Sequence, residues 1–314
     1  MTEHDFYHKH LISMEDLTPE DISQILNTSK LMKGISERDV KKAPTLRGKT
    51  IINMFAEPST RTRTSFEIAG KRLSADVINI STSGSSMSKG ESLKDMVANL
   101  EAMRPDLIVV RHKSDGAPAM ISRWTNCTVV NAGDGRHEHP TQSLLDMMTI
   151  LESKRKLEGL NVVIFGDIKN SRVARSNMIG MKKMGMNITV CGPKTMLPLY
   201  VEEMADNVTT SLADAVVGAD VIMALRIQTE RLEKAKFPNA REYSRLFGLT
   251  LSHLKKAKHN AIVLHPGPIN QGIEISPEVV EGQWSVVLDQ VTNGVAVRMA
   301  TLYLLLGAGL QKTE

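Results

Sequence analysis

The stretch that decides the fold is residues 50–67, TIINMFAEPSTRTRTSFE. Residues 50–55 are mostly β-branched, apolar or aromatic, and this composition predicts a buried strand. Phe66, Ala69 and Leu73 then recur at helical spacing, which predicts the inward face of a helix. The hydroxyl and arginine side chains between the two elements therefore lie at a helix N-terminus.

Polar side chains at this N-terminus favour an anion. Free backbone N–H groups and the positive end of the helix dipole attract negative charge. The side chains of Ser59, Thr60, Arg61, Thr62 and Arg63 add further donors, and the ligand that such a set suits is a phosphate. The alternative is that the hydroxyl residues only cap the helix and that the arginines are solvated.

Length and composition indicate a globular protein of two domains. The chain has 314 residues, of which 41% are hydrophobic and 24% charged. Its net charge of +4 suits acidic small molecules but is too small to indicate nucleic acid by itself.

The cysteines and the N-terminus predict a cytoplasmic protein. Cys127 and Cys191 are far apart and lack metal or redox spacing, so we expect reduced thiols with no catalytic role. No basic segment followed by an apolar core opens the chain, and no apolar run approaches about eighteen residues. We therefore expect neither export nor a membrane span.

Strand and helix patterns alternate along the chain, which is typical of parallel sheets with helices on both faces. Thr18 and Pro19 open the first helix as N-cap and first helical residue. The charged segment 152–159 is the candidate boundary between the halves. We predict an α/β fold with two doubly wound parallel-sheet domains and the active site in the cleft between them. The domains are residues 1–150, on which a C-terminal helix 293–314 packs back, and residues 151–292. Further strands are expected at 76–80, 107–110, 129–131, 161–167, 187–191, 221–225 and 261–264, and helices at 93–100, 140–148 and 171–184.

Cationic or hydrogen-bonding side chains follow strand after strand in both halves. Ligands of open parallel sheets bind beyond the carboxyl ends of the strands, so we expect these side chains to form one anion-binding cleft. They are Ser59 to Arg63, Arg111, His139 with Gln142, Arg172, Arg226 with Gln228, and the segment 265–268.

The sequence lacks the motifs that several types of catalysis require. The chain shows no paired carboxylates, no Ser-His-Asp order, no H-E-x-x-H and no glycine-rich nucleotide motif, and His137 and His139 lack the other ligands of a zinc site. We expect no metal, no cofactor and no covalent enzyme intermediate. Catalysis by positioning and by preorganised donors remains.

Taken together, the motifs resemble the aspartate/ornithine carbamoyltransferase family over nearly the whole chain. The resemblance lies in the segments 59–67, 139–142, 265–268 and 290–298. Lys89 in a Ser-Lys-Gly-Glu loop, Arg172 and the Arg226-Ile227-Gln228 segment resemble the aspartate branch. The ornithine branch is expected to carry a Ser-Met-Gly-type loop and a cysteine where this chain has Gly267.

The resemblance implies transfer of a carbamoyl group from carbamoyl phosphate to L-aspartate, early in pyrimidine synthesis. Both substrates are negatively charged, and bringing them within a few Å of each other costs several kcal/mol unless cations offset the repulsion. Arginine suits this task because it binds carboxylate and phosphate oxygens well. Lys89 would reach both ligands from a neighbouring subunit, which implies a homotrimer with shared sites.

The resemblance also implies a role for each site residue. The phosphate would be held by Ser59, Thr60, Arg61 and Thr62, and the carbamoyl oxygen would accept from Thr62, Arg111 and His139. The carbamoyl nitrogen would be positioned by Gln142, Gly267 and Pro268, and aspartate would be bound by Lys89, Arg172, Arg226 and Gln228.

For other polar residues a structural role is the simpler interpretation. We expect His265 to fix its loop, His137 to lie on the surface and Arg298 to be structural. Gln271 departs from the arginine that many relatives carry.

Two alternatives stay open at this point. One is an ornithine or other carbamoyltransferase of the same fold. The other is a non-catalytic anion- or RNA-binding protein, although an aromatic content of 4% offers few platforms for stacking bases. Regulatory chains and other pathway enzymes are candidate partners.

Overall fold

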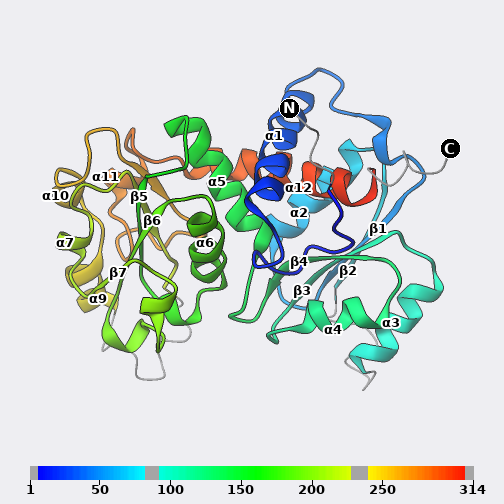
Figure 1. Cartoon of the computed structure of the whole chain (residues 1–314), viewed down its shortest axis with the longest axis horizontal. Helices are drawn as coiled ribbons and strands as arrows, with labels where there is room; N and C mark the ends of the chain where they lie inside the picture. The colour runs from blue at the N-terminus through cyan, green and yellow to red at the C-terminus, as the bar shows by residue number, and fades with distance from the viewer. Residues whose placement is uncertain (1–5, 82–91, 228–239, 308–314) are drawn as a thin grey trace. The chain divides into compact units, whose positions relative to one another are not determined.

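The computed structural model describes residues 6–81, 92–227 and 240–307, and its chain divides into two compact units (Figure 1). The first unit is Met1–Met148 with Thr292–Glu314, and the second is Thr149–Val291. The chain enters the second unit within helix α5 (Pro140–Lys154) and leaves it within α12 (Val287–Leu306). Each unit has a parallel sheet, so the predicted α/β architecture of two parallel-sheet domains is confirmed.

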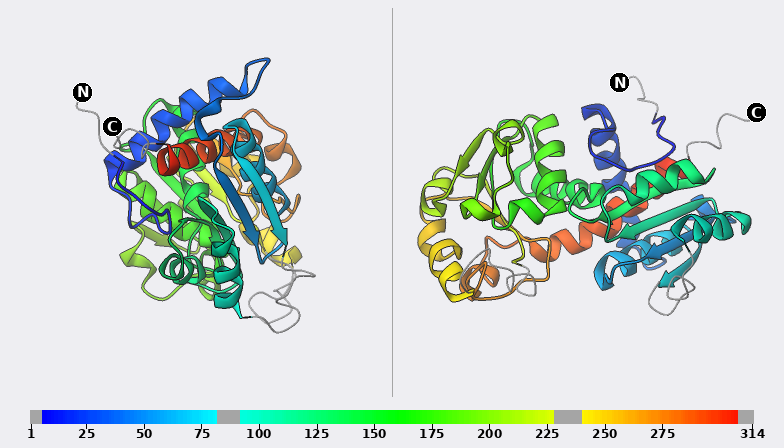
Figure 2. Two further views of the ribbon diagram at one scale, coloured as in Figure 1. Left: turned by 90° about the vertical axis from the view of Figure 1, so that its right-hand side faces the viewer. Right: turned by 90° about the horizontal axis from the view of Figure 1, so that it is seen from below.

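The first unit is built on a sheet with strand order β2-β1-β3-β4. All three strand pairs are parallel, and Figure 2 shows the arrows of β1 and β2 running in the same direction. The strands are β1 (Thr50–Phe55), β2 (Asp76–Ser81), β3 (Leu107–His112) and β4 (Thr128–Asp134). Besides α5 and α12, the helices are α1 (Pro19–Ser36), α2 (Thr60–Arg72), α3 (Leu93–Ala102), α4 (Ala117–Trp124) and the 3-10 turn η1 (Pro44–Leu46).

Handedness places the helices of this unit. The crossover from β1 to β2 runs in one direction, and the next two run in the other, so right-handed connections put α2 on one face and α3 with α4 on the opposite face. Met96 and Leu100 of α3 and Ile121 of α4 are buried against Ile52 and Val110 of the sheet, as this requires.

The second unit has a sheet with order β7-β6-β5-β8-β9, again parallel throughout. The strands are β5 (Asn161–Phe165), β6 (Asn187–Cys191), β7 (Asn207–Thr209), β8 (Val221–Ala224) and β9 (Ile262–Leu264). The helices are α6 (Arg172–Lys183), α7 (Leu212–Ala215), α9 (Ala240–Phe247), α10 (Leu251–Leu254) and α11 (Pro277–Val280), with 3-10 turns η3 (Ile168–Asn170), η4 (Lys194–Met196) and η5 (Val201–Glu203). Phe165 of β5 and Tyr243 of α9 lie fully buried in its core.

Each sheet reverses its strand order at one point. In the first unit the connections leave β1 and β3 in opposite directions, and in the second they leave β5 and β8 in opposite directions. Open parallel sheets bind ligands in the crevice at such a reversal, outside the carboxyl ends of the two strands. The loops that follow β1, β3, β5 and β8 are therefore the places at which to look for a site.

The first helix begins as its sequence predicts. The Thr18 hydroxyl accepts a hydrogen bond from the Asp21 backbone N–H at 3.1 Å, and the Asp21 carboxylate accepts one from the Thr18 N–H at 2.8 Å. This reciprocal pair is a capping box, which satisfies backbone donors at the start of α1.

An N-terminal segment extends the first sheet beyond β4. The Leu11 N–H donates to the Val129 carbonyl at 2.9 Å, and the Asn131 N–H donates to the Leu11 carbonyl at 2.8 Å. The Asn131 side chain also donates to the Ile12 carbonyl at 2.9 Å. The segment therefore covers the edge that β4 would otherwise present.

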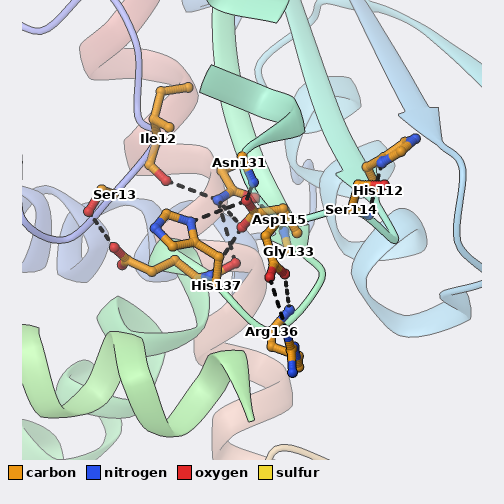
Figure 3. A network of polar contacts seen from close by, with 12 residues as sticks. Ile12, Ser13, His112, Ser114, Asp115, Asn131, Gly133, Arg136 and His137 are labelled. Carbon is orange, nitrogen blue, oxygen red and sulfur yellow. Dashed lines mark hydrogen bonds and ion pairs between the residues drawn. The ribbon is translucent and has the colours of Figure 1, made fainter. Parts of the chain in front are cut away.

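A buried carboxylate fixes the loop that follows β4. Asp134 accepts hydrogen bonds from the Gly116 N–H at 2.6 Å and from the Asn131 side chain at 2.9 Å, and it contacts His137 at 3.2 Å. Figure 3 shows Asn131 and His137 of this network beside Ile12 of the N-terminal segment. Burial raises the pKa of Asp134, but the hydrogen bonds outweigh it and leave the pKa lowered.

None of the helices in the described ranges combines the length and the hydrophobicity that a membrane span needs.

We expect Asp134→Asn to lower the free energy of unfolding by about 1–3 kcal/mol at neutral pH, because an amide cannot accept all of these hydrogen bonds. The carboxylate has a lowered pKa in the folded chain, so its contribution is fully present above its ordinary pKa of 3.8 and is lost as the pH falls through the folded-state value. We therefore expect urea denaturation between pH 7 and pH 4 to give a nearly constant difference in the free energy of unfolding between variant and wild type. This difference should become smaller only at the acidic end of the range.

Asp39→Asn is the matched control, since Asp39 is exposed. A loss of stability equal to that of the control would contradict the importance of the Asp134 network.

Candidate active site

The N-terminus of α2 carries the predicted phosphate-binding residues. Ser59 is the N-cap, with an extended backbone at φ −160° and ψ 96°, and its side chain makes no capping hydrogen bond. The Ser59 hydroxyl is thus not used as a helix cap, which removes the simplest structural explanation for it. Thr62 is buried, whereas Thr60 and Arg61 are exposed.

Arg111 lies beside the strand that leads into this loop. It pairs in register with Phe55 across β1 and β3, and its carbonyl accepts a hydrogen bond from the Ala56 N–H at 2.8 Å. Two residues that are far apart in sequence therefore lie at neighbouring strand ends at the reversal point of the sheet: Arg111 in the last part of β3, and the N-cap Ser59 after β1. The sequence pattern had indicated this proximity, and the strand register accounts for it.

The Arg111 side chain is directed by two acceptors. Its Nη1 donates to the Ala132 carbonyl at 3.3 Å, and its Nε lies 3.6 Å from the Glu57 carboxylate. The side chain is 13% exposed, so its charge is poorly screened by water. Glu57 was not among the predicted site residues, although it directly precedes Pro58 and the predicted phosphate-binding segment.

Arg298 of α12 is a second cation near Arg111. Its guanidinium donates to the Ser65 hydroxyl at 2.8 Å and lies 5.1 Å from the centre of the Phe66 ring. Burial lowers its pKa to about 9; the positive charge of Arg111 acts in the same direction, and Asp146 opposes them. The contacts with α2 agree with the structural role expected from the sequence.

His139 directly precedes α5 and Gln142 lies in its first turn, after the loop that follows β4. Both are buried, and the Gln142 N–H donates to the His139 carbonyl at 2.9 Å. The Gln142 side chain donates to Asp146 at 2.9 Å. Because β4 runs parallel to its neighbour β3, these two residues follow the same end of the sheet at which Arg111 lies.

The loop that holds His139 is fixed from the N-terminal side. The buried Glu138 carboxylate accepts hydrogen bonds from the Ser13 hydroxyl and, at 2.9 Å, from the Met14 N–H. Figure 3 shows Ser13 and His137 around this loop. The prediction for His137 was a surface position, but its side chain is partly buried and contacts Asp134, so it is part of this network.

In the second unit, Arg172 and Arg226 follow the two strands at the reversal point. Arg172 is the first residue of α6, whose N-cap Ser171 accepts from the Ala174 N–H at 3.1 Å. Arg226 comes two residues after β8, and β5 and β8 are paired in register. Gly166 has φ +125°, and a Cβ there would lie 3.0 Å from the Leu225 side chain, so the two loops pack closely.

The loop after β9 is held by His265. Its N–H donates to the Gln290 side chain at 2.9 Å, and its Nδ1 accepts from the Gly267 N–H at 2.8 Å. The interpretation of His265 as a loop-fixing residue is therefore confirmed. Gly267 has φ +64°, a conformation that favours glycine, and the bond to Pro268 is cis.

A buried glutamate that the sequence did not single out joins two of these loops. Glu274 accepts hydrogen bonds from the Ile227 N–H, directly after Arg226, and from Asn270, shortly after Pro268. Burial raises the pKa of its carboxyl, and these hydrogen bonds oppose the shift.

Two of the predicted residues, Lys89 and Gln228, lie outside the described residues. Within the described ranges, no group of His, Cys, Asp or Glu is arranged to hold a metal ion. Both cysteines are free thiols, and burial raises the pKa of Cys191 to about 12, which makes it a poor nucleophile at neutral pH.

The geometry thus gives each unit a set of cationic and hydrogen-bonding groups at the carboxyl ends of its strands. In the first unit a helix N-terminus, Arg111 and His139 lie at or after the ends of neighbouring strands, a combination suited to a phosphate and to an oxygen that becomes negative. In the second unit, Arg172 and Arg226 suit carboxylates.

Known proteins resemble this chain over both units. Residues 9–152 match the family model described as the carbamoyl-P binding domain of aspartate/ornithine carbamoyltransferase, and residues 158–305 match its Asp/Orn binding domain. The aspartate carbamoyltransferase catalytic subunit of Syntrophus aciditrophicus (strain SB) is 59% identical over 300 residues, which covers 96% of this chain and 98% of that protein.

Solved structures agree with the sequence relatives. The ornithine carbamoyltransferase from Pyrococcus furiosus matches with a TM-score of 0.86 and 30% identity, covering 95% of this chain and 97% of that one. The aspartate transcarbamoylase from Trypanosoma cruzi, in complex with carbamoyl phosphate and aspartate, matches with a TM-score of 0.85 and 26% identity, covering 96% of both chains. The chain therefore belongs to the aspartate/ornithine carbamoyltransferase family.

Proposed function

We propose that this protein transfers the carbamoyl group of carbamoyl phosphate to the α-amine of L-aspartate, giving N-carbamoyl-L-aspartate and phosphate. The observation that carries the proposal is the register of β1 with β3, which pairs Arg111 with Phe55 on the strand leading to the start of α2, where the phosphate would bind. The identity of 59% to an aspartate carbamoyltransferase catalytic subunit supports aspartate as the acceptor. The reaction would serve pyrimidine synthesis in the cytoplasm.

The first unit would bind the donor substrate. The start of α2 is suited to the phosphate, with backbone N–H groups and the helix dipole favouring its charge. Gln142, with the backbone of Gly267 and Pro268 from the second unit, would hold the carbamoyl nitrogen. The phosphate contacts would come from Ser59, Thr60, Arg61 and Thr62.

The carbonyl oxygen would receive hydrogen bonds from Thr62, Arg111 and His139. Attack by the neutral α-amine on the carbonyl carbon forms the new C–N bond and moves the carbonyl electron pair onto this oxygen. Arg111 and His139 would stabilise the resulting negative charge, because preorganised donors act strongly where water is excluded. The C–O bond to phosphate then breaks, and the departing phosphate accepts the amine proton.

The second unit would bind the acceptor. Arg172 and Arg226 offer forked donors that match carboxylate geometry, and Gln228 would add a neutral donor. Lys89 would contact both substrates from a neighbouring copy, so the active form would be a homotrimer with shared sites. Regulatory chains or other pathway enzymes remain candidate partners of such an assembly.

Carbamoyl transfer is tested directly with the purified chain. We expect colorimetric assays to detect carbamoyl-aspartate when carbamoyl phosphate and aspartate are supplied, and no citrulline when ornithine replaces aspartate. Citrulline formation would assign the ornithine branch instead. Salt-sensitive RNA binding without turnover with either acceptor would indicate a non-catalytic protein.

We expect Arg111→Ala to lower kcat by about 100- to 1,000-fold, the range found when one oxyanion donor is removed. The reason is that the variant loses a cation at the oxygen that becomes negative in the transition state. Arg123→Ala is the matched control, because Arg123 is exposed on α4 of the same unit. Steady-state kinetics with equal turnover in both variants would remove Arg111 from the mechanism.

Shared sites are tested by mixing two inactive variants. Lys89→Ala and Arg61→Ala chains should each be inactive as pure oligomers, but a randomly reassembled equal mixture should have about a quarter of its sites intact in a cyclic trimer. The measurements are activity and mass in solution. Verified mixed oligomers with no activity would show that each site is made by one chain.

A further inference from the structure

Glu274 holds together two loops that carry proposed substrate contacts. Its Oε1 accepts a hydrogen bond from the Ile227 N–H at 2.7 Å, and its Oε2 accepts one from the Asn270 N–H at 2.8 Å. Ile227 directly follows Arg226, and Asn270 comes two residues after Pro268. One carboxylate therefore connects the end of β8 to the loop after β9.

The Asn270 side chain closes this connection. Its Nδ2 donates to Glu274 Oε1 at 2.7 Å and to the Ile227 carbonyl at 2.9 Å. The two loops are thus joined both through Glu274 and directly, and all the donors are neutral. Glu274 has no exposed surface, so water does not compete for these hydrogen bonds.

The backbone at Glu274 is itself anchored in the core of the second unit. The Leu249 N–H donates to the Glu274 carbonyl at 2.9 Å, and the Ser276 N–H donates back to the Leu249 carbonyl at the same distance. Leu249, Ile275 and Ile227 are almost completely buried. The carboxylate is therefore supplied from a fixed position, and the two loops are held against it.

The chemistry of the proposed reaction explains why such a connection would matter. The Arg226 segment would hold the acceptor, and the Gly267–Pro268 backbone would hold the carbamoyl group, so their relative position sets the distance over which the amine attacks. Misplacement by about 1 Å is enough to cost a large factor in rate. A single buried carboxylate that fixes both loops would keep the two substrates in register.

We propose that Glu274 is a positioning residue for carbamoyl transfer, holding the aspartate-binding Arg226 segment against the Gly267–Pro268 loop. This inference rests on the proposed function. Glu274 touches neither substrate in this mechanism and acts through the backbone of its partners. Both of its carboxyl oxygens accept hydrogen bonds, which is what the incoming N–H groups require.

The test is Glu274→Gln, which preserves the shape but replaces one acceptor oxygen by an NH₂ group. In either amide orientation, one of the Ile227 and Asn270 N–H groups then faces a donor. We expect the KM for aspartate to rise by about tenfold or more, with a lower kcat. The Kd for inorganic phosphate, measured by calorimetry, should stay within about twofold of wild type, because the phosphate contacts lie in the first unit.

Two further variants make the test specific. Glu278→Gln is the matched control, since Glu278 is an exposed carboxylate on the nearby helix α11, and it should behave as wild type. Asn270→Ala removes the side-chain connection but leaves the backbone N–H groups of Ile227 and Asn270 bonded to Glu274. We expect it to change the KM for aspartate in the same direction by a smaller factor.

Hydrogen–deuterium exchange separates positioning from general loosening. In Glu274→Gln, peptides containing Ile227 and Asn270 should exchange faster, whereas β5 and β8 should be unchanged. A folded variant with wild-type kinetics would overturn the inference, and so would faster exchange throughout the second unit. A wild-type chain that forms no carbamoyl-aspartate would overturn the proposed function itself, an outcome distinct from an active wild type with an unaffected variant.

Discussion

Parallel pairing of β1 with β3 is the constraint on which the rest of the first unit depends. It places Arg111 opposite Phe55, so that β1 and β3 leave the sheet at the same end. This register brings together the helix N-terminus after β1 and the cation at the end of β3, and the parallel pairing of β3 with β4 adds the buried His139. Because side chains alternate along a strand, a slip of one residue would turn Arg111 to the opposite face.

Buried charge recurs wherever the proposed site is held in place. Asp134 fixes the loop before α5, Glu138 joins that loop to the N-terminal segment, and Glu274 joins two loops of the second unit. Isolated buried carboxylates are costly, and each of these is stabilised by several N–H or O–H donors. Hydrogen-bond donors around a negative charge, which would hold the anionic substrates, are therefore also what the protein uses to hold its own buried carboxylates.

Sequence patterns predicted much of this architecture because they are local. The strand at 50–55, the capped start of the first helix and the alternation that gives parallel sheets were all readable from spacing and composition. The rule that ligands bind beyond strand ends then selected Arg111, Arg172 and Arg226, whose backbone positions at the two reversal points agree with it. Their contacts with substrates remain a proposal.

The parts that sequence reasoning missed depend on long-range contacts. Leu11 pairs with β4 across more than a hundred residues, and no periodicity in the N-terminal segment indicates a strand partner. Glu274 looks like an ordinary surface glutamate in sequence, and only the fold brings Ile227 to its carboxylate. The end of β4 was also placed too early, at residue 131, because the buried Gly133 and Asp134 have little strand propensity.

The discontinuous first unit has a consequence for how the chain matures on the ribosome. Thr149–Val291 is one uninterrupted stretch and can reach its final fold as soon as it emerges. Ser65 and Phe66, by contrast, are translated before that stretch, and their partner Arg298 is translated only after it. The contacts of α2 with α12 would thus be completed only after the whole second unit has been synthesised.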